Sequence, residues 1–399
     1  MLEALYDIEN LYESFEKVCE ASGWKTRTQR YKEDVLLNLV ELRDKLIAGT
    51  WRPKAPWVFI VNERGKLRVI ESYSMEDRIV QRCLVQYVLL PVIRPKLIYD
   101  NDASLTERGT SHFRNRLWYK LNRFAKLHGN KGYALVGDFS KFFDNIQHEK
   151  LMECLKELGI DDETLDFVKM ILDAHQVDVS YLSDEEYADC MNVVFDNIQY
   201  QTIDKSLLTG EKMMPKGTGI GSHLAQLAGV VLPYKLDNYI KIVKGVKDYA
   251  RYNDDWYIIH ESKEFLVDLL EDIYKICERD GIFLNKNKTH ITPLRRGFTI
   301  LKTKYFITDD KQVVAIPKKS VFTRERKKLR GLKRRLDNGL ISIEKIQGMY
   351  KSWRESTIQR GYVNESIQSV DGYFQKQFGI PYDFPIPKEQ IEREEIFNW

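Results

Sequence analysis

Three aspartates lie at the ends or turns of strand-forming runs, and their spacing could support metal-dependent chemistry. Asp138 follows the buried-type strand of YALVGDFS (133–140). Asp254 and Asp255 lie at the turn of a segment with an expected strand at 247–252, turn at 253–254 and strand at 255–260. If these segments share one sheet, the three carboxylates converge and repel one another unless a cation neutralises them. Hard oxygen ligands suit Mg²⁺, with Mn²⁺ as a substitute. Two such ions about 3.5–4 Å apart would activate a nucleophilic oxygen and stabilise a leaving pyrophosphate, which predicts a polyphosphate substrate.

Two other Asp-Asp pairs serve as internal controls for this interpretation. The pair at 161–162 begins an apparent helix, where helix capping explains it. The pair at 309–310, in FITDDKQVV, falls at an expected hairpin turn, and no upstream carboxylate partner is indicated. Taken alone, the pair at 254–255 also fits an ordinary turn. Only the elements around it can distinguish it from the other two.

Positive charge is concentrated in one segment, although the net charge is only +3. Residues 318–335 contain ten Lys and Arg against one Glu. A solvated helix face is the plain alternative, but pairing with acids at i,i+4 cannot balance so many cations, which favours a polyanionic partner. Lys66 and Arg68 lie in an expected hairpin at 57–72 and suit a triphosphate, with an ordinary polar hairpin as the alternative.

Helical and strand patterns alternate along the chain without an internal repeat. A glycine-rich loop, PKGTGIGSH (215–223), precedes a long helical pattern, and a polar, acidic insertion covers about 176–211. In the second of two helices expected within 1–50, the apolar positions are Leu36, Leu37, Val40, Leu42 and Leu46. Further helices are expected at 75–93, 112–129, 148–159, 161–175, 224–243, 263–281, 318–335, 341–355 and 365–378, and further strands at 298–307 and 313–316.

The composition is that of a folded globular protein of two or three compact units. The 399 residues are 43% hydrophobic and 12% aromatic. No apolar run approaches the ~20 residues of a membrane span, and the acidic N-terminus is unlike a cleavable signal. The five cysteines are scattered without CxxC spacing, which argues against a zinc site or a disulfide framework. We therefore predict a cytoplasmic protein.

Several short blocks, in this order, resemble the polymerase domain of reverse transcriptases over about residues 30 to 380. DFSKFFDNI, with Asp138, is similar to the first catalytic block, and YNDD (252–255) is similar to the Tyr-x-Asp-Asp signature. The specificity lies in the order and spacing of the blocks, since each is weak alone. The other matching blocks are the 57–72 hairpin, GIGSHLAQ (219–226), GIFLNKNKTHI (281–291) and GFTILKTKY (297–305).

The resemblance implies an α+β fold of the right-hand polymerase class, with fingers, a palm built on an antiparallel sheet, and a helical thumb. Tyr350, Trp353 and Tyr373 would belong to the thumb core. The implied bounds are 1–28 for an N-terminal helical extension, 29–125 for the fingers, 126–310 for the palm with its insertion at about 176–211, 311–380 for the thumb, and 381–399 for a C-terminal tail.

The resemblance also implies roles for individual residues. Asp138, Asp254, Asp255 and the backbone carbonyl of Phe139 would bind two metal ions. Phe143 matches the aromatic position that closes against the sugar 2′ carbon and favours deoxynucleotides, although in isolation it also fits a core residue. An RNA-dependent RNA polymerase would be expected to carry a smaller or polar group there and a Gly-Asp-Asp turn.

Further residues are implied at the nucleotide and the leaving group. Lys288 is the candidate general acid for pyrophosphate, with Lys286 as the competing choice, and Lys66 and Arg68 would grip the triphosphate. Gly221 and Gln226 would contact the nucleotide. Gly219 and Gly221 would let the backbone approach it closely. His148 and His223 lack metal-like partners, so surface or packing roles are expected. Asn253 would tune the fit against the primer end.

The glycine block departs from the commonest pattern of the family. Ile220 replaces the usual Gln, and Ala225-Gln226 replaces Ser-Pro. A similar form is found in the reverse transcriptases of diversity-generating retroelements and of bacterial antiphage defence. The basic segment would be the first thumb helix, which follows duplex backbone without base readout. Its implied contacts are Lys318, Lys319, Arg324, Lys327, Lys328, Arg330, Lys333 and Arg334.

Together these features predict an RNA-directed DNA polymerase that makes cDNA from a dedicated noncoding RNA, in bacterial antiphage defence. A diversity-generating retroelement enzyme is the alternative, and a catalytically inert RNA-binding scaffold is a remote one. No nuclease, protease, integrase or ribonuclease H segment is recognisable. The expected partners are the noncoding RNA as template and primer, dNTPs, the cDNA product, and an accessory protein or a second copy of the chain, without a membrane. The insertion is the expected place for a system-specific contact.

Overall fold

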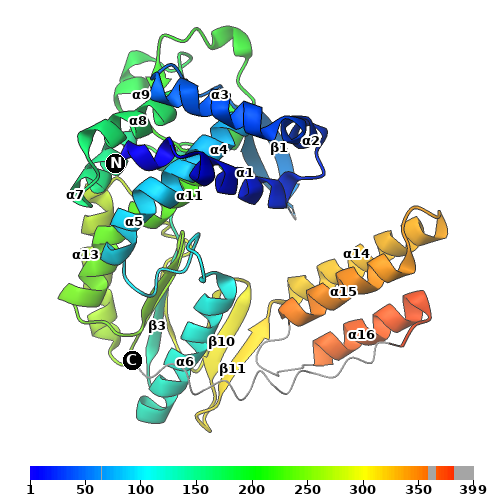
Figure 1. Cartoon of the computed structure of the whole chain (residues 1–399). Coiled ribbons are helices and arrows are strands. Elements are labelled where there is room, and N and C mark those ends of the chain that lie inside the picture. The colour runs from blue at the N-terminus through cyan, green and yellow to red at the C-terminus, as the bar shows by residue number, and fades with distance from the viewer. Residues whose placement is uncertain (64, 358–364, 382–399) are drawn as a thin grey trace. The chain divides into compact units, whose positions relative to one another are not determined.

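The computed structural model describes residues 1–63, 65–357 and 365–381. The chain forms two compact units (Figure 1). The first comprises Met1–Leu117 and Leu135–Ile291. The second comprises Trp118–Ala134 and the described residues from Thr292 onward. The expected C-terminal tail lies almost wholly outside the described residues.

The N-terminal helices are more numerous than predicted. After a short turn at Leu2–Leu5 come α1 (Ile8–Ser22), α2 (Thr26–Glu33) and α3 (Val35–Ile47). The prediction of two helices within 1–50 was therefore wrong. The expected apolar face was also partly wrong. Leu42 and Leu46 are buried, but the Leu36, Leu37 and Val40 side chains are exposed.

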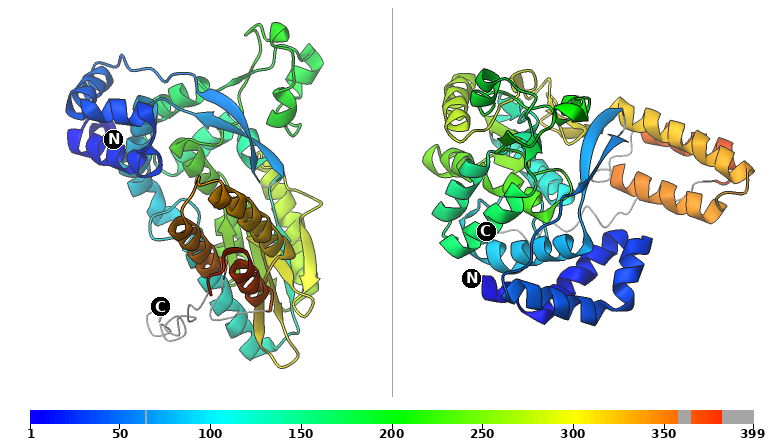
Figure 2. Two further views of the ribbon diagram at one scale, coloured as in Figure 1. Left: turned by 90° about the vertical axis from the view of Figure 1, so that its right-hand side faces the viewer. Right: turned by 90° about the horizontal axis from the view of Figure 1, so that it is seen from above.

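The expected hairpin forms the two-stranded antiparallel sheet of β1 (Trp57–Glu63) and β2 (Lys66–Ser72). It extends as a long ribbon (Figure 2), and every β1 side chain is exposed. The helical run that follows consists of α4 (Met75–Cys83), a π-helical segment (Leu84–Leu89) and α5 (Leu90–Ile93). Pro91 does not stop this run, because it lies in the first turn of α5, where no N–H donor is required.

A four-stranded sheet carries the predicted carboxylates. Its order is β6-β7-β3-β8, and β6 and β7 form the expected hairpin. The long helix expected after the glycine loop is interrupted at Leu232–Pro233. The strands are β3 (Tyr133–Gly137), β6 (Tyr249–Tyr252), β7 (Asp255–His260) and β8 (His290–Pro293). The accompanying helices are α6 (Thr110–His128), α7 (His148–Glu157), α8 (Asp162–Asp173), α11 (His223–Val231), α12 (Tyr234–Asn238) and α13 (Lys263–Arg279), with a π-helical segment at Tyr239–Val243.

The insertion forms a small structured element. The strands β4 (Val177–Asp178) and β5 (Met213–Met214) pair antiparallel and close its base. Val179, Cys190 and Met214 form its own apolar cluster, and Phe195 packs against them. Between the strands lie α9 (Asp184–Ala188), α10 (Asn197–Tyr200) and a 3-10 turn (Lys205–Leu207).

The described residues of the second unit from Thr292 onward form a three-stranded sheet and three helices. The sheet order is β11-β10-β9, with β9 (Phe298–Ile300), β10 (Thr303–Ile307) and β11 (Val313–Pro317). The single strand expected at 298–307 is therefore a hairpin, since Leu301 and Lys302 have positive φ and turn the chain. The helices are α14 (Lys319–Asp337), α15 (Ile343–Thr357) and α16 (Glu365–Phe378), which lie side by side (Figure 1).

The core between these helices includes Leu329, Ile346, Tyr350 and Phe374. Trp353 and Tyr373 pack against this core, as expected for structural rather than stacking roles. No described helix of the chain is long and apolar enough to cross a membrane.

Candidate active site

The Asp-Asp turn lies at one end of a tight hairpin. Tyr252 pairs with Asp255, so only Asn253 and Asp254 form the turn. Asn253 has φ of 53°, in the left-handed region, which asparagine tolerates better than most residues. Its Oδ1 atom is buried and has no hydrogen-bond partner within the described chain. The hairpin therefore presents two consecutive carboxylates and one buried, unpaired acceptor at the same end.

Asp138 directly follows β3, the strand next to β7 in the sheet. A Cβ atom at Gly137 would lie 2.0 Å from the indole of Trp256, the residue after Asp255. Only glycine fits at this position, because any side chain would collide with the buried ring. This close packing brings Asp138 to the hairpin end that carries the other two aspartates.

Asp254 and Asp138 influence each other electrostatically. The pKa of Asp254 is raised by burial and then by the negative charge of Asp138, whereas Lys288 and Lys66 lower it. Two carboxylates close enough to raise a pKa in this way favour either a proton or a cation between them. Asp138 therefore lies near Asp254, whereas the convergence of all three carboxylates stays a prediction.

Two residues of the 281–291 block hold the Asp138 carboxylate. The Lys288 ammonium donates to both carboxylate oxygens, at 2.9 Å each. The Asn285 side-chain amide donates to Oδ2 at 3.1 Å, and its backbone N–H donates to the Asp138 carbonyl at 2.8 Å. Both lysines of this block are exposed, but it is Lys288 that pairs with the Asp138 carboxylate. Asn285 was not predicted, although it lies in the same block.

The donor chemistry of this cluster suits a divalent metal. The Ser140 N–H donates to the Phe283 carbonyl and the Asn285 N–H donates to the Asp138 carbonyl. These two bonds flank Phe139, so its carbonyl points away from the 283–285 segment. Carboxylates and a backbone carbonyl are the hard oxygen ligands that Mg²⁺ prefers. In the described part of the chain, no three His, Cys, Asp or Glu side chains are grouped closely enough to hold a metal. Lys288 instead neutralises Asp138.

Phe143 lies beside the hairpin turn. A Cβ atom at Gly229 of α11 would be 3.1 Å from the Phe143 ring and 3.4 Å from Asn253 Oδ1. The Phe143 ring, α11 and the turn residue are therefore neighbours. The Phe143 carbonyl also accepts a hydrogen bond of 3.0 Å from the Thr218 backbone N–H in the glycine loop.

The glycine loop packs against β2 of the same unit. With φ of 64°, Gly219 would place a Cβ atom 1.9 Å from the Glu71 carboxylate. A Cβ atom at Gly221 would lie 2.3 Å from the Glu71 carbonyl, and the Glu71 N–H donates to the Ile220 carbonyl at 3.0 Å. The absence of side chains at Gly219 and Gly221 is thus required by an internal contact. Contact of Gly221 with a nucleotide stays a prediction.

Gln226 and the two histidines lie farther along these elements. Gln226 is exposed and lines a cavity of about 100 Å³ together with Arg82 and His223. Burial and the nearby arginines lower the pKa of His223 to about 4. His148 is buried, and its Nε2 atom lies 2.7 Å from the Gly217 carbonyl. His148 therefore has the expected packing role.

The two predicted triphosphate ligands differ in their surroundings. The charge of Lys66 lowers the pKa of Asp254 and of Asp144, so Lys66 is electrostatically coupled to the carboxylate cluster. Arg68 donates to Glu63 of the same hairpin at 2.6 Å, in an exposed ion pair. Exposed pairs are weak, so Glu63 leaves Arg68 available to a stronger anion.

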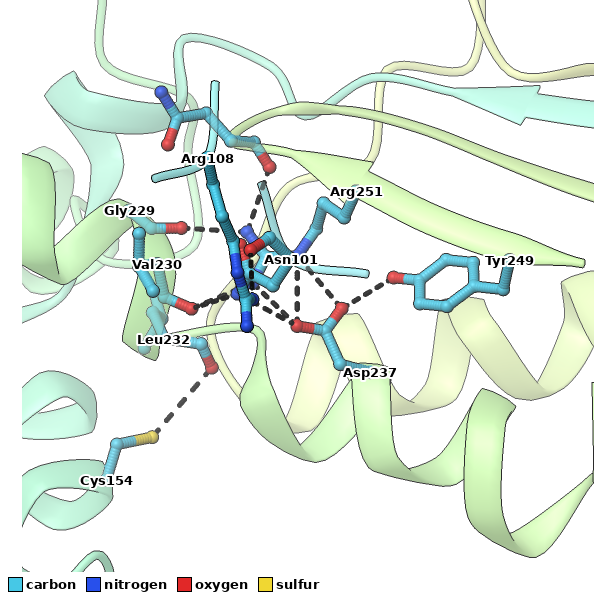
Figure 3. A network of polar contacts seen from close by, with 10 residues as sticks. Asn101, Arg108, Cys154, Gly229, Val230, Leu232, Asp237, Tyr249 and Arg251 are labelled. Carbon is cyan, nitrogen blue, oxygen red and sulfur yellow. Dashed lines mark hydrogen bonds and ion pairs between the residues drawn. The ribbon is translucent and has the colours of Figure 1, made fainter. Parts of the chain in front are cut away.

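A buried arginine, not predicted from the sequence, supports the hairpin (Figure 3). Arg251 is 0% exposed, and Asp237 of α12 is 1% exposed. The Arg251 guanidinium donates to Asp237 Oδ1 at 2.9 Å and Oδ2 at 2.7 Å. It also donates to the carbonyls of Gly229 and Val230 near the end of α11, and to that of Asn253 at 3.0 Å. All five N–H groups of the guanidinium are used, and they join the turn to α11 and α12.

The predicted nucleic-acid contacts lie on α14 of the second unit. Glu325, Leu329 and Leu332 face inward, so the cations lie on the opposite face. Lys333 pairs with Asp337, and Lys328 lies 3.5 Å from Glu325. The remaining predicted contacts are exposed and form no ion pair within the described residues. They are Lys318, Lys319, Arg324, Lys327, Arg330 and Arg334.

Comparison with known proteins agrees with the sequence interpretation. Residues 53–313 match the family model described as reverse transcriptase (RNA-dependent DNA polymerase). Among curated proteins, Protein YkfC of Escherichia coli (strain K12) is 27% identical over 139 residues, which are 35% of this chain and 36% of that protein. The match thus spans about a third of its curated relative.

Among solved structures, telomerase from Candida albicans in complex with the TWJ fragment of telomeric RNA is similar. It has a TM-score of 0.49 and 16% identity, and the match covers 82% of this chain and 55% of the telomerase chain.

Proposed function

The chain belongs to the reverse transcriptase (RNA-dependent DNA polymerase) family, and we propose from this premise that it synthesises DNA on an RNA template. The α+β architecture agrees with the right-hand polymerase class. Residues 29–125 would form the fingers, 126–310 the palm and 311–380 the thumb, after an N-terminal extension at 1–28. The observation that supports the activity best is the placement of Asp138, directly after β3, beside the strand β7 that begins at Asp255.

In this proposal, Asp138, Asp254, Asp255 and the Phe139 carbonyl hold two Mg²⁺ ions, and Mn²⁺ can replace them. When bound, these ions supply charge stabilisation for the attacking oxygen and the leaving pyrophosphate. Asn285 orients Asp138 through its two hydrogen bonds.

In this proposal Lys288 is the general acid. Its ammonium lies 2.9 Å from the Asp138 carboxylate. With substrate bound, its half-exposed ammonium is free to reach the leaving pyrophosphate and donate a proton. Lys66 and Arg68 bind the triphosphate, Gly221 and Gln226 border the nucleotide, and Phe143 excludes a ribose hydroxyl.

The biological role that we propose is antiphage defence, with a dedicated noncoding RNA as template and primer. The exposed cations of α14 bind the duplex backbone. The insertion is where an accessory protein, the RNA or a second copy of the chain makes contact. Sequencing the DNA made by the protein with its copurified RNA would identify template and primer together.

The test of activity uses the purified full chain, a primed RNA template, Mg²⁺ and labelled dNTPs. We expect primer extension by the wild-type protein and its loss in Asp254→Ala and in Asp255→Ala. Asp310→Ala is the matched control. It alters an exposed aspartate of the other Asp-Asp pair, at 309–310, which lies in the β10–β11 turn. It should retain full activity.

Extension that survives both Asp254→Ala and Asp255→Ala would overturn the proposed mechanism. Binding of RNA without extension by the wild-type protein, across Mg²⁺ and Mn²⁺, would instead identify the inert scaffold.

A further inference from the structure

Hydrogen bonds connect the turn that carries Phe143 to the insertion. Asn145 is 3% exposed and ends this turn, Phe142–Asn145. Its side-chain oxygen accepts the Phe195 N–H at 2.7 Å, and its amide donates to the Phe195 carbonyl at 3.0 Å. One side chain therefore pairs with both backbone groups of a single insertion residue, as a neighbouring strand would.

The same amide also closes the turn internally. Asn145 Nδ2 donates to the Lys141 carbonyl at 3.0 Å. Lys141 has φ of 45°, a left-handed conformation that is costly for lysine and needs support from its surroundings. Its ammonium lies 3.0 Å from Asp196, the residue after Phe195. The insertion thus contacts both ends of the turn, through the Lys141–Asp196 ion pair at its start and the Asn145–Phe195 hydrogen bonds at its end.

Further contacts fix residues 190–197 of the insertion, here called the arm, beside this segment. Gln147 donates to the Met191 carbonyl at 3.0 Å, and buried Lys216 donates to the Val193 carbonyl at 2.5 Å. Phe195 itself packs on the apolar cluster of the insertion. Hydrogen bonds and apolar packing therefore hold the arm in place, so that it can set the position of the turn.

We propose that the arm is a specificity element, in which Asn145 and the Lys141–Asp196 pair fix Phe143 at the position where its ring discriminates between deoxyribose and ribose. This inference rests on the proposed function. The Phe143 carbonyl accepts a hydrogen bond from the glycine loop, and the Phe143 ring packs beside α11. The arm supplies the remaining restraint, through the two ends of the turn.

Discrimination by a ring against one hydroxyl depends on ring position to a fraction of an ångström. A misplacement of about 1 Å can change a rate by about 100-fold. Asn145 is a positioning residue, since it acts through Phe143. Releasing it should allow the ring to retreat, which admits ribonucleotides while deoxynucleotides still react. A purely structural role would lower both activities together.

The experiment measures kcat/KM for dNTP and rNTP incorporation by the full chain on one primed RNA template. We expect Asn145→Ala to lower the dNTP/rNTP ratio by about tenfold or more, with dNTP incorporation affected much less. Asp196→Asn removes the ion pair from the exposed side and should lower the ratio in the same direction, by about two- to threefold. Phe143→Ala sets the maximum effect.

Asn192→Ala is the matched control, because the side chain of this exposed arm residue donates a hydrogen bond to Asp189, outside the turn. It should leave the ratio unchanged. A folded Asn145→Ala and a folded Asp196→Asn that both keep the wild-type ratio would overturn the proposal, as would a Phe143→Ala that keeps it. A wild-type protein that incorporates neither nucleotide would refute the proposed function itself, and this inference with it.

Discussion

Replacement of Arg251 by methionine should strongly destabilise the first unit. The substitution leaves the Asp237 carboxylate, which is 1% exposed, without its cation. It also removes the donors to the carbonyls of Gly229, Val230 and Asn253. Breaking a buried ion pair by removing one partner costs about 3–5 kcal/mol. We therefore expect a loss of that size in the free energy of unfolding.

Urea denaturation followed by tryptophan fluorescence, to which the buried Trp256 contributes, would measure the loss. The matched control is Arg43→Met. This substitution breaks the exposed Arg43–Asp44 pair and should cost at most about 1 kcal/mol. If Arg251→Met costs no more than Arg43→Met, the reasoning about a desolvated pair is refuted.

A double variant separates charge from positioning. Adding Asp237→Leu to Arg251→Met removes the uncompensated carboxylate, so part of the lost stability should return, although each carbonyl left unpaired still costs about 1–3 kcal/mol. Polymerase activity should not return, because the Asn253 carbonyl still lacks its donor and the turn is no longer held. Recovery of both stability and activity would show that Arg251 does not position the turn.

Three further predictions concern packing, pH and salt. Gly137→Ala should lower the midpoint of thermal unfolding, because its Cβ atom would overlap the Trp256 ring at 2.0 Å; an unchanged midpoint would contradict this packing. Burial raises the pKa of Asp144 to about 6, so this carboxyl stabilises the fold at low pH and the contribution is lost as pH rises through 6. The urea midpoint of the wild type should therefore fall more steeply from pH 4 to 7 than that of Asp144→Asn, and parallel curves would refute it. Lys327→Gln should reduce the salt slope of RNA–DNA duplex binding by about 0.9, whereas Lys333→Gln, whose ammonium is already paired, should reduce it less; equal slopes would count against the α14 interface.

Much of the hairpin and its controls could be predicted from local sequence. The ladder of β6 and β7 leaves only the two predicted residues in the turn. Asp161 caps α8 through the Thr164 N–H, as capping predicted. The pair at 309–310 lies in the turn between β10 and β11. These features depend on neighbours in sequence, where residue type and spacing are informative.

Contacts between distant segments could not be predicted in this way. The sequence predicts that Gly219 and Gly221 allow close approach of a nucleotide. No local pattern indicates that Glu71 instead fills the space beside Gly219. Apolar periodicity continues through Pro233, so the sequence pattern predicts one long helix where the structure has two. Nor does sequence spacing indicate that Lys288 pairs with Asp138, since that contact depends on how β3 meets the 281–291 block.

The closed base of the insertion has a consequence for how this chain can change over evolutionary time. Val177 lies opposite Met214, so the two ends of the insertion are held together whatever lies between them. Doubling the length of a loop whose ends are fixed costs only about 0.6 kcal/mol. Segments on either side of residues 190–197 can therefore lengthen, shorten or acquire new surfaces at little cost in stability. The insertion is thus a site where new binding partners can be gained while the four-stranded sheet stays unchanged.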